Sequence, residues 1–223
     1  NKNKMSTVKK KSDIYVPSRE QNVFDKVERY NAINGNYVPS KCLKAVYREI
    51  MSASISQQRN TSIAYYGEPG SFTHQAARHK FGSSVDYVTK RSIEAVMLSI
   101  SEGSSDYGII PIESSTQGLI SHTLDLLASK GGVEENVCIY AEVLSAIDYH
   151  LLSNATQESD ITLLYCTREA YTRLENYILA HLSKDCQVVI VNSSAQAAAK
   201  ASTYDVDDTK HTTAAISSNL AAE

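Results

Sequence analysis

Small hydroxyl side chains recur where predicted strands give way to predicted helices. They are Ser71 and Thr73, then Ser114, Ser115 and Thr116, then Thr167, and finally Ser193 and Ser194. Ser and Thr at such positions ordinarily cap the helix that follows. Four such junctions in one chain favour a further role, because helix N-termini present free N–H groups at the strand ends where α/β proteins bind ligands. The pattern predicts a cleft for a small carboxylate or phosphate compound.

The first junction discriminates between these two ligands. Residues 67–70 read GEPG, which is neither a Walker loop nor the G-x-G-x-x-G fingerprint of dinucleotide-binding proteins. A carboxylate is therefore favoured over a phosphate. Residue types and spacing leave open whether the cleft belongs to an enzyme or to a two-lobed binding protein.

An alternation of β-rich and helical runs positions these junctions and predicts an α/β fold. Strands are expected at about 63–66, 107–111, 161–165, 188–191 and 214–216, and the apolar run 141–152 reads as a further strand. Helices are expected from the 67–70 turn through residue 80, and at 92–102, 118–127, 168–181 and 195–202.

Two amphipathic helices precede this region. Apolar residues recur at helical spacing between residues 18 and 34, and again from about Ser40 onward. Two helices alone cannot cover both apolar stripes. They must pack on the next domain, on sequence outside this chain, or on a second copy of themselves.

Bulk composition excludes several classes of function. The net charge of −3 and the absence of Trp argue against nucleic acid as a partner. The four cysteines are far apart and form no C-x-x-C pair, so neither a metal site nor a disulfide framework is indicated. Neither a membrane-spanning run nor a signal peptide is evident. We expect a soluble cytoplasmic protein, with the plastid as the alternative compartment.

Several stretches resemble, in order, the signature segments of prephenate dehydratases. Residues 65–73 (YYGEPGSFT) and 106–118 (DYGIIPIESSTQG) are similar to the early segments, and 192–198 (NSSAQAA) and 214–223 (AAISSNLAAE) to later ones. Upstream, residues 14–20 (IYVPSRE) and 48–54 (REIMSAS) resemble the second and third helices of the chorismate mutase fused to such enzymes. The chain is thus identified as a member of the bifunctional chorismate mutase/prephenate dehydratase (P-protein) family, truncated at both ends.

This resemblance implies a fold and an activity. The fold is α/β: a two-lobed dehydratase domain of the type II periplasmic-binding-protein kind, preceded by an α-helical chorismate mutase remnant. The implied boundaries are 1–59 for the mutase part and 60–223 for the dehydratase, with lobes at about 60–140 and 141–223. The implied substrates are prephenate and chorismate, with no cofactor and no metal. A homodimer is expected, because that mutase type is an intertwined helical dimer.

The resemblance also assigns roles to single residues. Glu113, Ser114 and Ser115 would be catalytic, at the centre of a cleft between the lobes. The implied substrate-binding residues are Gly70, Ser71, Phe72, Thr73, Gly118, Thr167, Ser193, Ser194 and Ala195. Of the mutase site, Arg19, Glu20 and Gln58 remain.

Departures from the family pattern predict altered activity. Ser114 stands where the family usually has Asn, and residues 166–169 (CTRE) replace a common Ser-His-Pro-Gln, with Cys166 expected to be a packed small residue. The family's Thr-Arg-Phe segment and regulatory domain would lie beyond Glu223, and the first mutase helix before Asn1. Little mutase activity is expected of this chain. A non-catalytic protein that binds a small carboxylate is the competing hypothesis.

Overall fold

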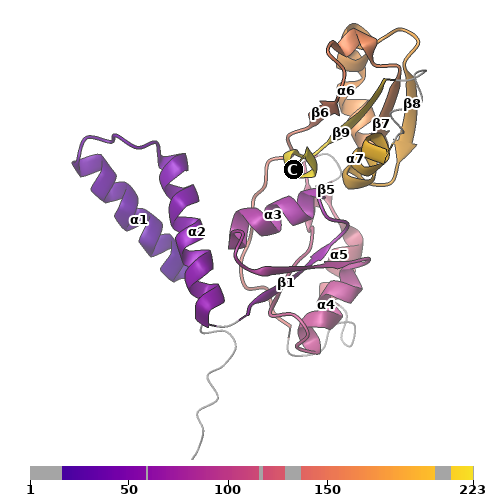
Figure 1. The fold of residues 1–223 in the computed structure, drawn as a ribbon. Helices are drawn as coiled ribbons and strands as arrows, with labels where there is room; N and C mark the ends of the chain where they lie inside the picture. The colour runs from indigo at the N-terminus through magenta and orange to yellow at the C-terminus, as the bar shows by residue number, and fades with distance from the viewer. Residues whose placement is uncertain (1–16, 59, 116–117, 129–136, 204–211, 223) are drawn as a thin grey trace, which may run out of the picture.

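The computed structural model describes residues 17–58, 60–115, 118–128, 137–203 and 212–222 (Figure 1). A helical hairpin is followed by two α/β units, which we call lobe one (residues 62–128) and lobe two (residues 150–222). Thr116 and the part of the mutase-like stretch before residue 17 lie outside the described residues. None of the described helices is long and apolar enough to cross a membrane.

The hairpin consists of α1 (Pro17–Ile33) and α2 (Ser40–Gln58), as predicted. Phe24 is its buried hydrophobic contact, 8% exposed, with the Arg48 guanidinium 6.0 Å from the ring centroid. Much of the apolar surface stays uncovered, including Ile33 at 77% and Val46 at 56% exposure. The hairpin therefore leaves apolar surface bare in this structure, as two helices must.

The C-terminal half of α2 contacts lobe one (Figure 1). Glu49 accepts hydrogen bonds from the Ser83 N–H (3.1 Å) and the Ser83 hydroxyl (2.5 Å). Ser52 Oγ accepts one from the Ser84 N–H at 3.1 Å. The next domain thus covers this end of the hairpin, which is one of the three alternatives left open by the sequence.

A parallel sheet of order β2-β1-β3 forms the centre of lobe one. Its strands and the helices between them are β1 (Ser62–Tyr66), α3 (Phe72–Phe81), β2 (Asp86–Lys90), α4 (Ile93–Ser101) and β3 (Tyr107–Ile109). Apolar side chains of β1 and α3 share one core around Ile63 and Ala77, both fully buried. A short antiparallel pair follows, β4 (Glu113–Ser114) with β5 (Gly118–Leu119), and then α5 (Ser121–Ala128).

Lobe one differs from the sequence-based expectation at two places. The helix predicted at 118–127 begins only at Ser121, because Gly118 and Leu119 pair with β4 and the Ile120 N–H donates to Ile112 O at 2.9 Å. The strand β2 was not predicted. It is an edge strand whose residues are only partly buried, so its apolar alternation is weak.

Lobe two is a four-stranded sheet of order β6-β9-β7-β8, in which only β6 is antiparallel to its neighbour among the described strands. Its elements are β6 (His150–Ser153), the 3-10 turn η2 (Glu158–Asp160), β7 (Leu163–Thr167), α6 (Arg168–His181), β8 (Gln187–Val191), α7 (Ser194–Thr203), β9 (Thr213–Ser217) and η3 (Asn219–Ala222). Residues alternate along β7, so that Leu164 packs with α6 and Leu163 with α7. The sheet is therefore covered on both faces.

The apolar run 141–152 forms a strand only at its end. Residues 137–149 have no regular structure, and β6 starts at His150. Leu144 is 85% exposed, so this run is not a buried strand in this chain.

Candidate active site

The turn between β1 and α3 carries the first predicted cluster, Gly70 to Thr73. Ser71 is the N-cap of α3, and its Oγ accepts a hydrogen bond from the His74 N–H at 3.2 Å. Gly70 has φ +83°, a left-handed conformation that favours glycine. The turn is closed by the Ser71 N–H, which donates to Glu68 O at 3.0 Å. Sequence and backbone geometry together fix where α3 begins.

The hydroxyls of lobe two also cap helices. Thr167 Oγ1 accepts from the Ala170 N–H at 3.2 Å at the start of α6. Ser193 Oγ accepts from the Gln196 N–H at 3.1 Å at the start of α7. Ser194, the first residue of α7, is buried. The ordinary capping role is thus confirmed at these junctions, and the site gains rigid helix N-termini from it.

Glu113, Ser114 and Ser115 lie on the β4–β5 hairpin rather than at the start of a helix, so the second predicted junction was wrong. Ser114 pairs with Gly118 across the hairpin. Gly118 has φ +71°, and a Cβ placed there would meet nothing within 4 Å. Glu113 and Ser115 are exposed. The hairpin is anchored where the buried Thr123 hydroxyl donates to Pro111 O at 2.8 Å.

Contacts between the lobes converge on the turn before α3. Ser218 Oγ of lobe two donates to Gly70 O at 2.5 Å, and Ser193 Oγ donates to Glu68 Oε2 at 3.0 Å. Phe72 meets Tyr149 edge to face, with ring centroids 5.6 Å apart. The structure therefore brings the predicted residues Gly70, Phe72 and Ser193 to the junction of the lobes.

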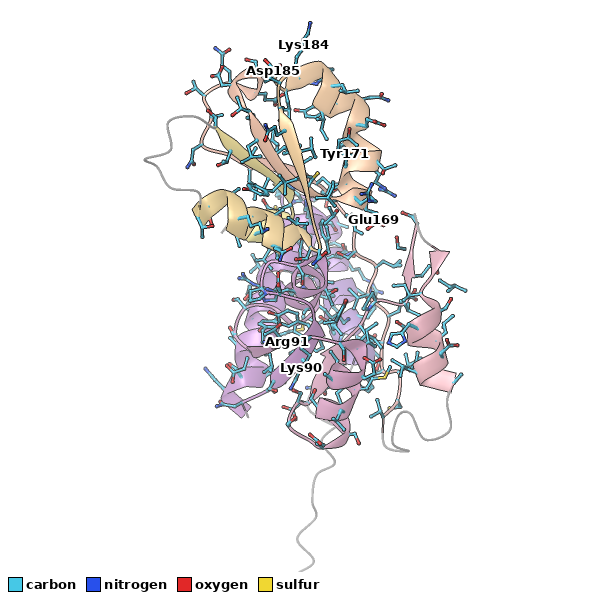
Figure 2. All side chains as sticks on the ribbon, turned by 90° about the vertical axis from the view of Figure 1, so that its right-hand side faces the viewer. Lys90, Arg91, Glu169, Tyr171, Lys184 and Asp185 are labelled. Carbon is cyan, nitrogen blue, oxygen red and sulfur yellow. The ribbon has the colours of Figure 1, made fainter. Side chains whose placement is uncertain are left out.

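Arg173 of α6 is a cation that sequence reasoning missed. Its Nη2 lies 3.4 Å from Ser115 Oγ, across the gap between the lobes. Burial raises the pKa of the Tyr149 phenol, Glu169 raises it further, and Arg173 lowers it. Figure 2 shows Glu169 at the end of α6 nearer lobe one, whereas Lys184 and Asp185 lie at the far end of lobe two. Glu169 and Arg173 are four residues apart, so helical periodicity could have placed them on one face.

Cys166 behaves as predicted, as a packed small residue. It is fully buried in the core beneath α6, and burial raises the pKa of its thiol to about 11. A thiol with so high a pKa stays protonated at neutral pH and is a poor nucleophile.

The predicted mutase residues lie on both helices of the hairpin. Arg19 is exposed at the start of α1, and Gln58 is the last residue of α2. Glu20 forms an ion pair with Lys80 of α3 at 2.9 Å, and only 10% of the Glu20 side chain is exposed. Glu20 thus contacts lobe one.

A cavity of about 500 Å³ lies beside the turn that precedes α3, between α3 and α7. Its described lining includes Gly70, His74 and Arg78 from lobe one, and Ala195 and Ala221 from lobe two. Glu113 and Ser115 are not among its described lining residues, and a second cavity of about 260 Å³ lies within lobe two between β6 and α6. Within the described residues, no three His, Cys, Asp or Glu side chains form a group that could hold a metal ion.

Comparison with known proteins agrees with this architecture. The prephenate dehydratase family model matches residues 63–223, and the chorismate mutase type II model matches residues 3–59. The bifunctional chorismate mutase/prephenate dehydratase of Aquifex aeolicus is 33% identical over 82% of this chain and 49% of that protein. Its counterpart in Pseudomonas aeruginosa is 30% identical over 83% of this chain and 48% of that protein. The chain therefore spans about half the length of these relatives.

Solved structures show the same fold. The prephenate dehydratase of Arthrobacter aurescens in complex with L-Phe superposes with a TM-score of 0.53 at 22% identity, over 72% of this chain and 51% of that one. The enzyme from Staphylococcus aureus gives a TM-score of 0.50 at 23% identity, over 70% of this chain and 54% of that one. Because the family model covers most of the sequence, the chain belongs to the prephenate dehydratase family, in its bifunctional chorismate mutase/prephenate dehydratase branch.

Proposed function

We propose that the complete protein converts prephenate to phenylpyruvate, water and CO2, a carbon–oxygen lyase reaction of L-phenylalanine biosynthesis. The observation that carries the proposal is the position of Arg173, 3.4 Å from Ser115 and on the opposite lobe. The guanidinium of one lobe then donates a hydrogen bond to a hydroxyl of the other lobe, next to Glu113. Prephenate is a dicarboxylate, and an Arg guanidinium is well suited to hold one of its carboxylates.

The reaction makes two demands on this cleft. The ring C–O bond and the ring C–C bond to the carboxylate break together, and the electrons of the C–C bond complete the aromatic ring. The departing hydroxyl takes up one proton and leaves as water. We assign delivery of that proton to Glu113 and Ser115, with Ser114 hydrogen-bonded to the substrate. The backbone N–H groups of Phe72 and Thr73, of residues 193–195 and of the residues after Thr167 would hold the carboxylates. Gly70 and Ser71 would shape the turn that presents them, and Gly118 would leave the hairpin loop open.

We further propose that residues 1–59 are part of a chorismate mutase domain and residues 60–223 part of a dehydratase domain. Arg19, Glu20 and Gln58 would belong to a site that converts chorismate to prephenate in the complete protein. The uncovered stripe of α1 and α2, including Ile33 and Val46, would be buried by a second copy in a cytoplasmic homodimer. Sedimentation velocity tests this proposal. The chain should sediment as a monomer if the stripe is covered in some other way.

The decisive experiment measures phenylpyruvate formed from prephenate by its absorbance in alkali. It uses this chain and a version extended through the Thr-Arg-Phe segment expected downstream. We expect turnover in the extended form, and loss of turnover in its Ser115→Ala variant. Ser56→Ala is the matched control, since its hydroxyl donates to Ala53 O at 2.9 Å within α2, away from the junction of the lobes. Prephenate binding without turnover in both lengths would reject the catalytic assignment.

A further inference from the structure

His74 sits at the base of the Gly70–Thr73 turn with its ring held on two sides. It stacks on Tyr65 with ring centroids 4.5 Å apart and planes 8° apart, and it meets Tyr87 edge to face at 5.4 Å. In this orientation its Nδ1 accepts a hydrogen bond from the Gly70 N–H at 3.1 Å. The imidazole is thus an acceptor aimed at the turn.

The other side of Gly70 is held by lobe two. Gly70 O accepts from the hydroxyl of Ser218, which is fully buried. A Cβ on Gly70 would lie 3.1 Å from the Cβ of Ala221. One peptide unit of lobe one is therefore fixed through its N–H by His74, and the next through Gly70 O by the chain leaving β9.

His74 bonds to the turn through both its backbone and its side chain. The His74 N–H donates to Ser71 Oγ at 3.2 Å, while the His74 side chain accepts from the backbone just before Ser71. The arrangement resembles a capping box, except that an imidazole replaces the usual carboxylate or amide and accepts from the N–H of the residue before the N-cap. The start of α3, which carries Ser71, Phe72 and Thr73, depends on both bonds.

We propose that neutral His74 is a positioning residue of the cleft, which holds the Gly70–Ser71 turn in the geometry at which the two lobes meet. The part of the proposal that concerns prephenate rests on the proposed function. The bond requires the tautomer in which Nε2 carries the proton and Nδ1 is free to accept.

The surroundings of His74 favour the neutral ring. Burial lowers the pKa of His74, and the positive charge of Arg78 lowers it further. The groups packed on it from β1 and β2 are the phenols of Tyr65 and Tyr87. The α7 and η3 residues described in the lining of the adjoining cavity are Ala, Ser and Leu, which do not titrate. Because the folded pKa lies below the unfolded value, the stabilising bond is present above about pH 6.5 and is lost as the pH falls through the folded pKa.

Two substitutions distinguish the hydrogen-bond acceptor of His74 from the packing of its aromatic ring. His74→Phe keeps an aromatic ring against Tyr65 but removes the acceptor. His74→Asn places Oδ1 where Nδ1 stood and does not titrate. His79→Gln is the control, because His79 lies on the same helix but away from the turn. Partial desolvation lowers the pKa of His79 as well.

The first measurement is nuclear magnetic resonance of the full chain. Imidazole ¹⁵N shifts should report the Nε2-protonated tautomer. Gly70 amide exchange, normalised to its intrinsic rate, should speed up on acidification in the parent chain, be fast at every pH in His74→Phe, and be independent of pH in His74→Asn. An Nδ1-protonated ring, or unchanged Gly70 exchange in His74→Phe, would overturn the proposal.

The second measurement is prephenate affinity at neutral pH. We expect His74→Phe to weaken it by roughly fivefold, as for loss of one neutral hydrogen bond, with His74→Asn and His79→Gln within about twofold of the parent. Weakening by Asn but not by Phe would show that only the ring matters, and equal weakening by both would show that an acceptor at this position is not enough. Either outcome would refute the positioning role. A chain that binds no prephenate would instead count against the proposed function, and the resonance data would still decide the role of His74.

Discussion

Arg173 owes its position to the geometry of α6 rather than to its sequence neighbours. The helix starts at the Thr167 cap, and one and a half turns later Arg173 emerges toward lobe one. There it is exposed, so its electrostatic contribution is screened by water and salt. A single exposed cation is suited to recruiting and orienting a carboxylate, while the buried contacts around Gly70 hold the lobes.

Replacing this cation gives a residue-level prediction. Arg173→Gln should weaken prephenate binding by roughly three- to tenfold at low ionic strength, and by less in high salt, because the lost interaction is a screened one. Calorimetric titration at two salt concentrations measures it. Lys184→Gln removes one positive charge at the far end of lobe two (Figure 2) and should leave affinity unchanged. If both variants weaken binding equally, Arg173 acts only through net charge and has no place in the site.

Among the turns and short strands, Gly70 and Gly118 are a natural pair. Both adopt left-handed φ, +83° and +71°, but only Gly70 faces another lobe, with Ala221 Cα 3.2 Å from the position of its missing Cβ. A Cβ added at Gly118 would have no atom within 4 Å. The same substitution therefore tests backbone strain at one position, and strain plus crowding at the other.

Gly118→Ala should cost about 1–2 kcal/mol of unfolding free energy, the penalty for an L-residue in this region. Gly70→Ala should cost about 1–3 kcal/mol more, because the added methyl group overpacks the contact with Ala221. Urea unfolding followed by circular dichroism compares the two. Equal losses would mean that the lobes separate freely at Gly70, contrary to the contact seen here.

How far the sequence predicted these elements depended on how local their causes are. Helix α6 was predicted with its observed bounds, because the Thr167 cap and its apolar period are both local signals. The β4–β5 hairpin was misread as a helix start, since a Ser-rich stretch before Gly118 fits either structure. The roles of Ser218 and Arg173 could not be predicted, because each depends on a contact with the other lobe. Family resemblance supplied candidate residues, but not which ones touch.

At the scale of the whole molecule, the hairpin and lobe one are joined by polar contacts at one end of α2. Glu49 holds Ser83, Ser52 holds Ser84, and Glu20 pairs with Lys80. Ion pairs and hydrogen bonds at a partly exposed surface are individually weak. The close approach of Gly82 to Ser52 is what makes the fit specific, since Ser52 is only 1% exposed and a Cβ on Gly82 would lie 2.5 Å from Ser52 Cβ.

This approach predicts that Gly82→Ala will detach the hairpin from lobe one. Gly82 ends α3 with φ +78° and ψ −168°, a conformation almost restricted to glycine, so alanine brings backbone strain of about 1–3 kcal/mol together with a collision against α2. Hydrogen exchange should become faster in the C-terminal half of α2 while β1 stays protected.

The strain and the collision can be separated with Ser52→Gly, which removes the Cβ that Gly82→Ala would strike. Ser52→Gly alone should destabilise by about 1 kcal/mol or more, as glycine does inside a helix. The double variant should then be less destabilised than the sum of the two single variants, with a coupling free energy of about 0.5–3 kcal/mol, the range found for residues in contact. Strict additivity, with α2 exchange unchanged in Gly82→Ala, would show that the hairpin does not rest on lobe one in solution. Relief in the double variant would instead mean that the hairpin and lobe one are packed as one body through this contact.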